Sequence, residues 1–200
     1  MSDKTATTDH PVHSLVASRW SPYAWADASV SDEDLAALFE AARWAPSSYN
    51  EQPWRWIVAR REDEAAFAKL LSTLVETNQS WAQHAPVLAL GLASLRFERN
   101  GKPNKAAHHD LGGAAAHLSF EATARGLAVH QMIGIEPDRV RELYAVPEGV
   151  EPLTALAIGV AGEAAALPDK LRERETAPRT RKALTELVFA ERYGRPAPGF

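Results

Sequence analysis

Residues 45–56 read APSSYNEQPWRW, and this stretch decides where the neighbouring helices and strands can lie. Pro46 and Pro53 each disfavour helical geometry in the residue before them, so a helix cannot easily pass through. The stretch is therefore predicted to be a rigid, extended connection. Between the prolines lie four small polar residues that can form hydrogen bonds with a flat ligand, namely Ser47, Ser48, Asn50 and Gln52.

Apolar spacing on both sides of this connection predicts helices interspersed with strands. Ser31 is a suitable N-cap for a helix that ends before Pro46. Further helices are predicted over residues 64–76, 106–125 and 137–144, and strands over 54–59, 86–95, 127–132 and 153–161. Residues 163–178 are predicted to form a charged linker. Because several strands are apolar enough to be buried on both faces, we expect a sheet covered by helices, of the α/β or α+β class.

The composition is typical of one globular domain. Of the 200 residues, 46% are hydrophobic and 24% are charged. A net charge of −4 gives no reason to expect binding to nucleic acid or to an anionic membrane surface. The absence of cysteine excludes disulfides and cysteine-ligated metals. No apolar run approaches the ~20 residues that span a bilayer, and the first residues lack a signal-peptide core, so we expect a cytoplasmic protein without membrane partners.

The two ends of the chain differ from its centre. Residues 1–13 are polar and are predicted to be a flexible N-terminal arm. Residues 190–200 form a similar C-terminal tail, which could wrap a partner subunit. The predicted domain therefore spans residues 14–189.

Common cofactor and metal motifs are absent. No GxGxxG follows a predicted strand, so a dinucleotide-binding Rossmann unit is not supported. A Walker A loop, a GxSxG elbow and an HExxH pair are also missing. His108, His109 and Asp110 are adjacent in the chain, but successive residues of a helix do not face each other. No metal site is expected.

Basic residues near both ends of the chain form a candidate anion site. Arg19 and Ser21 offer a guanidinium and a hydroxyl, which suit a phosphate monoester carrying about −1.5 to −2 charges. Arg179 and Arg181 would share a face of an extended segment. Each pair alone also fits a solvated basic surface. Together with the polar connection at 45–56, the arginines point to a flavin site.

Two further segments could meet the ring of such a ligand. Asn78 lies in the segment ETNQSW, where a helix-terminal asparagine is the simpler interpretation. Met132, Ile133 and Gly134 lie at the end of a predicted strand, and glycine there lets a backbone approach a flat ring closely. An ordinary turn at the end of the strand is the alternative.

These pieces, in this order, resemble the FMN-dependent nitroreductase family from about Ser14 to Phe189. The resemblance rests on SRWS, WAPSSYNEQPWRWIV, the Asn78 segment, HHDLGGAAAHLSFEATARGLAVHQMIG and RTRKALTELVF. It implies an α+β fold with a mixed central sheet flanked by helices. It also implies an intertwined homodimer with FMN at the subunit interface, packed along the helix at residues 106–125.

The resemblance also implies roles for individual residues. Arg19 and Ser21, together with Arg179 and Arg181, would hold the FMN phosphate and ribityl end. Asn78 would lie near the pyrimidine edge of the ring, and the backbone at Ile133 and Gly134, after Met132, would meet N5. The loop residues that would reach in from the other subunit are Pro46, Ser47, Ser48 and Asn50.

Two positions depart from the family pattern. Tyr23 stands where members often carry a lysine or arginine facing the N1–C2 side of the flavin. A neutral hydroxyl stabilises the reduced ring less than a cation does, so a flavin that is harder to reduce is expected unless Lys105 or another cation takes this place. Trp20 replaces a smaller or polar residue and could narrow the pocket.

The implied activity is transfer of hydride from NADH or NADPH through FMN to nitroaromatics, quinones or similar electron-poor acceptors. One pocket shared by both substrates predicts ping-pong kinetics. No side chain is an obvious general acid, so solvent or Tyr23 would supply protons. Alternatives are a flavin-binding protein without turnover, a relative that dehalogenates or consumes flavin, and a structural domain without cofactor.

Overall fold

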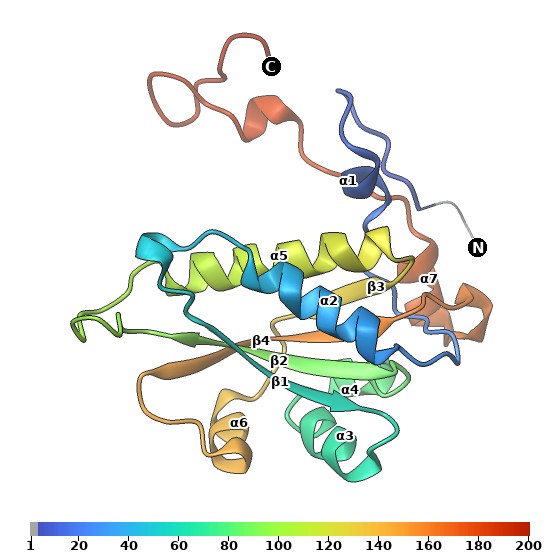
Figure 1. The fold of residues 1–200 in the computed structure, drawn as a ribbon. Coiled ribbons are helices and arrows are strands. Elements are labelled where there is room, and N and C mark those ends of the chain that lie inside the picture. The colour runs from blue at the N-terminus through green and yellow to red at the C-terminus, as the bar shows by residue number, and fades with distance from the viewer. Residues whose placement is uncertain (1–3) are drawn as a thin grey trace.

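A four-stranded sheet forms the centre of the computed structural model, which describes residues 4–200 (Figure 1). The strands are β1 (Trp54–Arg60), β2 (Val87–Ser94), β3 (Ala128–Met132) and β4 (Val150–Gly159), in the spatial order β1-β2-β4-β3. All three neighbouring pairs are antiparallel. The expectation of a mixed sheet was therefore wrong, because apolar runs predict buried strands but do not encode their relative direction.

The two central strands carry the core. Every residue of β2 except Ser94 is buried, which confirms the prediction of a strand covered on both faces. A bulge between Gly91 and Leu92 shifts its register with β4. A Cβ atom on Gly91 would lie 2.8 Å from both Thr154 Cγ2 and Trp56 Cζ3, so only glycine fits between the neighbouring strands here.

Two helices cover one face of the sheet, α2 (Asp32–Arg43) and α5 (Ala107–Ala124) (Figure 1). The Ser31 hydroxyl accepts a hydrogen bond from the backbone of Asp34 at 3.0 Å and caps α2 as predicted. Leu111 and Leu118 of α5 are buried against this face, while Gly112 and His117 remain exposed. Helix α5 therefore presents a second surface away from the sheet.

The other face carries α3 (Glu64–Leu71), α4 (Glu76–Ala82) and α6 (Pro137–Tyr144) (Figure 1). The single helix predicted over residues 64–76 was wrong, because α3 ends at Leu71. Leu74 instead forms an isolated antiparallel bridge with Ile135. Both residues are buried, so the apolar spacing that suggested one long helix comes partly from this bridge.

The last quarter of the chain differs most from expectation. Helix α7 (Asp169–Thr176) and the 3-10 turn η2 (Ala164–Ala166) replace the linker predicted at residues 163–178. Beyond them lies only the short 3-10 turn η3 (Leu184–Glu186), and the tail extends away from the body beside α1 (Ser14–Ser18) (Figure 1). Residues 1–3 of the predicted arm lie outside the described residues. No helix among residues 4–200 is long and apolar enough to cross a membrane.

Candidate functional site

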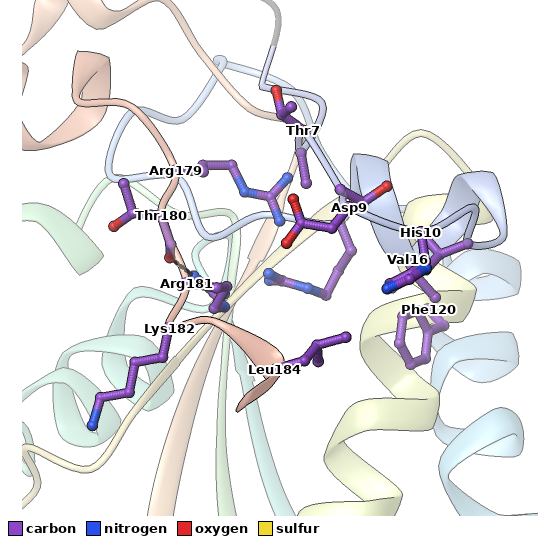
Figure 2. A pocket seen from close by; sticks show the side chains of 14 residues that line it. Thr7, Asp9, His10, Val16, Phe120, Arg179, Thr180, Arg181, Lys182 and Leu184 are labelled. Atoms are coloured by element: carbon purple, nitrogen blue, oxygen red, sulfur yellow. Dashed lines mark hydrogen bonds between the residues drawn. The ribbon is translucent and has the colours of Figure 1, made fainter. Parts of the chain in front are cut away.

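The arginines from the two ends of the chain converge. Arg19, Arg179 and Arg181 line one cavity of about 390 Å³. Its other walls come from the N-terminal arm, from Phe120 of α5 and from the segment that leads to η3 (Figure 2). More than 150 residues separate Arg19 from the other two arginines, so this convergence depends on the whole fold.

The cavity is electrostatically positive. Burial lowers the pKa of Arg19 first, and the charges of Arg179 and Arg181 lower it further. Burial likewise lowers the pKa of Arg179, and the charge of Arg181 adds to that effect. A lowered arginine pKa means that the positive charge is disfavoured by its surroundings, so an anion bound here would relieve both desolvation and mutual repulsion.

The three guanidinium groups donate hydrogen bonds to uncharged oxygen atoms. Arg19 Nη1 donates to Ser21 Oγ at 3.4 Å, and Arg181 Nη1 donates to the carbonyl of Thr180 at 2.7 Å. Among residues 4–200, no carboxylate lies within ion-pair distance of any of the three. Cations grouped around a hydroxyl and lacking counter-ions fit the doubly charged phosphate of FMN.

Trp20 lies beside the N-terminal arm. The ammonium group of Lys4 lies 5.6 Å from the centre of its indole ring. Trp20 is half-buried and is not among the residues that line the cavity with the arginines.

The stretch that follows Pro46 is more tightly wound than predicted. Ser48–Asn50 form the 3-10 turn η1, so the connection is not extended throughout. Tyr49, Asn50 and Gln52 have φ angles of 55°, 57° and 51°, in the left-handed region that side chains rarely adopt. The Ser47 hydroxyl accepts a hydrogen bond from the Gln52 backbone at 3.0 Å and closes this loop.

A buried carboxylate that was not predicted anchors the same loop. Asp110 of α5 is 3% exposed, and its Oδ2 accepts a hydrogen bond from the backbone N–H of Ser48 at 3.0 Å. The signal in the sequence was an aspartate among the apolar positions of a helix, which usually needs a buried partner. Among the described residues, no group of three His, Asp or Glu side chains could hold a metal ion.

Asn78 and the segment after β3 meet directly. Asn78 Nδ2 donates to the carbonyl of Gly134 at 3.0 Å, and the Val75 backbone donates to the same oxygen at 3.1 Å. A Cβ atom on Gly134 would lie 2.5 Å from Asn78 Nδ2. Glycine is therefore needed here for close approach of the Asn78 side chain. Met132 is buried, whereas the side chain of Ile133 is 80% exposed.

Tyr23 belongs to an aromatic cluster. Its ring packs edge-on against Trp81 and His130, with centroids 5.2 and 4.8 Å away. His130 Nδ1 lies 2.9 Å from the carbonyl oxygen of Pro22, and burial lowers the pKa of this histidine. The ring of Tyr23 is thus held by packing, two residues after Ser21 in the chain.

Glu175 of α7 is a second buried carboxylate that the sequence did not reveal. It is 3% exposed, and it accepts backbone hydrogen bonds from Tyr23 at 2.8 Å and Ala24 at 3.4 Å. Burial raises its pKa, and the two backbone hydrogen bonds offset part of that rise. Glu175 therefore ties the loop that follows Ser21 to the helix that leads to Arg179.

Within one chain, the candidate groups form separate clusters. The loop at 47–52 touches α5 at Asp110, while the arginine cavity touches the same helix at Phe120. Ten residues of α-helix separate these points by about 15 Å. Neither the loop nor Asn78 and Gly134 line the arginine cavity.

Most of the sequence matches a known protein family. A sequence model described as the nitroreductase family matches residues 16–160. The chain therefore belongs to the nitroreductase family, which confirms the resemblance drawn from its motifs.

Individual proteins agree with this assignment. A solved structure described as an oxidoreductase containing FMN is 32% identical, has a TM-score of 0.90, and covers 98% of this chain and 99% of its own. An uncharacterised 15.4 kDa protein of Mycolicibacterium smegmatis is 34% identical over 129 residues, 63% of this chain and 84% of the relative. A Streptomyces coelicolor protein provisionally named an NADH dehydrogenase/NAD(P)H nitroreductase is 29% identical over 143 residues, 62% of this chain and 70% of the relative.

Proposed function

We propose that this protein is an FMN-dependent oxidoreductase. It would pass hydride from NADH or NADPH through flavin N5 to nitroaromatics, quinones or similar electron-poor acceptors in a ping-pong cycle. The observation that carries the proposal is the convergence of Arg19, Arg179 and Arg181 on one cavity, without a carboxylate partner among residues 4–200. The FMN in the solved relative and the nicotinamide-linked name of the Streptomyces relative support the cofactor and the reductant.

Different residues would bind different parts of the flavin. Arg19 and Ser21, with the second basic segment, would hold the phosphate and the ribityl end. Asn78 would face the pyrimidine edge, where its carboxamide can both donate and accept hydrogen bonds. Because Asn78 already contacts Gly134, a single hydrogen bond would align two of the groups that surround the ring. The bound flavin supplies the redox chemistry, and the protein supplies orientation and electrostatics.

A homodimer would complete the site. In one chain, the loop at 47–52 and the arginine cavity are separate clusters along α5. A second chain could bring its own loop to the flavin that this cavity holds. Trp44, which lies beside His117 of α5, is 71% exposed, and α5 itself has small residues at Gly112, Gly113 and Ala116. Such surfaces are typical of subunit interfaces. We further propose a cytoplasmic location, a domain spanning residues 14–189, and no nucleic acid or membrane partner.

The absorption spectrum of the purified protein is the first test. We expect a yellow protein that binds FMN at micromolar concentration or tighter and is reduced anaerobically by NADH or NADPH. Arg19→Gln should weaken FMN binding about tenfold or more, since hydrogen bonds to charged groups contribute about 1.5–3 kcal/mol. Arg141→Gln on α6 is the matched control and should bind as the wild type does.

Three outcomes distinguish the alternatives. A colourless protein that takes up no FMN would contradict the proposal and favour a structural domain. Bound FMN without steady-state oxidation of NADH or NADPH in the presence of menadione or nitrofurazone would favour a storage protein. Parallel double-reciprocal plots with both substrates varied would support the ping-pong cycle.

A further inference from the structure

The N-terminal arm forms one wall of the arginine cavity. Thr7, Asp9 and His10 line it opposite Arg181 and Lys182 (Figure 2). This part of the chain was expected to be a loose arm, and no motif in it suggested a role in binding. Because the arm lines the same cavity as the arginines, it would lie next to an anion that they bind.

Specific hydrogen bonds fasten the arm in this position. The backbone N–H of Ala6 donates to the carbonyl of Ala17, at the end of α1, at 2.9 Å. The ammonium group of Lys4 donates to the carbonyl of Ala177 at 3.0 Å. The arm is thereby linked to both segments that bring arginines to the cavity.

Arg179 also holds the arm in place through hydrogen bonds. Its Nη1 atom donates to the carbonyl oxygens of Lys4 and Ala17, each at 2.6 Å. The same nitrogen therefore joins the arm to the end of α1 instead of being free for an anion. Within residues 4–200, Arg19 forms a long hydrogen bond to Ser21, and Arg181 forms one to the neighbouring carbonyl of Thr180.

We propose that residues 6–10 of the N-terminal arm form a wall of the cofactor phosphate site. Arg179 is a positioning residue that holds this part of the arm in place. Arg19 and Arg181 contact the phosphate itself. This inference rests on the proposed binding of FMN and divides the basic residues into two roles. It also assigns Asp9 a place close enough to the phosphate for its negative charge to oppose binding.

A double-mutant cycle in the full-length chain tests the fastening. Ala6→Pro removes the N–H that donates to Ala17, and Arg179→Met removes the guanidinium while keeping a side chain of similar reach. FMN and riboflavin are titrated into both single variants and the double variant, with flavin fluorescence as the signal. We expect each single variant to lose about tenfold in FMN affinity and none in riboflavin affinity, because riboflavin lacks the phosphate.

The double variant decides between the two roles of Arg179. If Arg179 acts by fastening the arm, the double variant loses no more than about twofold beyond either single variant. Losses that multiply to about a hundredfold would mean that Arg179 binds the phosphate independently and would overturn the assignment. Wild-type FMN affinity in Ala6→Pro, or an equal loss for riboflavin, would overturn the role of the arm.

Asp9→Asn supplies a test of opposite sign that does not depend on damaging the arm. Removing a carboxylate close to a phosphate should tighten FMN binding about threefold at low salt, and the gain should vanish at 1 M salt. Asp138→Asn on α6 is the matched control and should change nothing. An unchanged FMN affinity in Asp9→Asn would contradict the arm's position. A wild-type protein that binds no FMN would instead refute the proposed function itself.

Discussion

The side-chain amide of Asn78 donates a hydrogen bond to the carbonyl oxygen of Gly134 at 3.0 Å, joining α4 to the segment after β3. The two residues are 56 positions apart in the chain. Their contact fixes the distance between a carboxamide and a stretch of exposed backbone. Both groups would face the flavin in the proposed site, so the contact sets the geometry of the ring's surroundings.

Gly134→Ala should disturb this contact. The added Cβ would lie 2.5 Å from Asn78 Nδ2 and 2.8 Å from Val75 Cγ2, so neighbouring atoms must move. We expect a loss of about 1–3 kcal/mol in the free energy of unfolding, measured by urea denaturation, together with weaker FMN binding. Asn78→Ala in the same background removes one of the two clashes and should restore part of the stability. No recovery would mean that Val75 alone sets the constraint.

Glu175 should make stability depend on pH. Its pKa is raised in the folded protein by burial, so between the ordinary value near 4.5 and the raised value the folded state binds more protons than the unfolded state. Stability from this group is therefore present at low pH and is lost as the pH rises through that window. Glu175→Gln cannot ionise and should lack this decline.

Urea denaturation of the wild type and Glu175→Gln at intervals from pH 4 to pH 7 measures the effect. The difference in unfolding free energy, wild type minus variant, should fall as the pH rises. Glu173→Gln, on the exposed side of the same helix, is the control for the loss of one charge. Parallel curves for wild type and Glu175→Gln would show that the carboxylate is as well stabilised when buried as in water.

Substitutions on α5 should separate folding from assembly. A Cβ on Gly112 would meet no atom within 4 Å in the chain, so Gly112→Arg is compatible with the folded subunit. If the Gly112 face of α5 packs against a second copy, the bulky cation should convert a dimer into a monomer with reduced FMN affinity. Light scattering coupled to gel filtration measures the mass. Asp138→Arg, on α6 across the sheet, should remain dimeric; a monomeric wild type would refute the interface.

Tyr23 should influence the flavin potential. Replacing it with lysine offers a cation to the reduced ring, and a gain of ~1.4 kcal/mol would raise a two-electron potential by about 30 mV. Tyr23→Met, which is uncharged and similar in length to lysine, controls for the loss of the ring contacts with Trp81 and His130. Redox titration of the three proteins gives the midpoints. An unchanged midpoint in Tyr23→Lys would mean that position 23 does not face the ring.

Local signals in the sequence predicted much of the fold. Pro137 opens α6 and the helix ends at Tyr144, as expected, because a proline at the first helical position is a strong local signal. Helix α7 was missed because most of its side chains are charged and exposed, and its buried contact is made by a carboxylate, Glu175. The order and direction of the strands depend on long-range pairing that local patterns do not encode.

Some residues of the candidate site were likewise expected from the sequence, and others were found only in the structure. The arginines were candidates because their two segments match motifs of the family, whereas each pair alone also fits a solvated surface. Asp110 and Glu175 could not be predicted, since their partners are backbone N–H groups far away in sequence. The N-terminal arm has no apolar periodicity, so only the folded structure places it beside Arg19.

The three left-handed residues of the loop at 47–52 have a consequence for recognition. Tyr49, Asn50 and Gln52 each occupy a sparsely populated backbone region, at a cost of order 1–3 kcal/mol apiece. The free-energy cost of these left-handed conformations is met when the chain folds, before any ligand binds. A loop shaped in advance loses little entropy when it closes over a planar molecule, so its affinity would derive from rigidity as much as from new contacts.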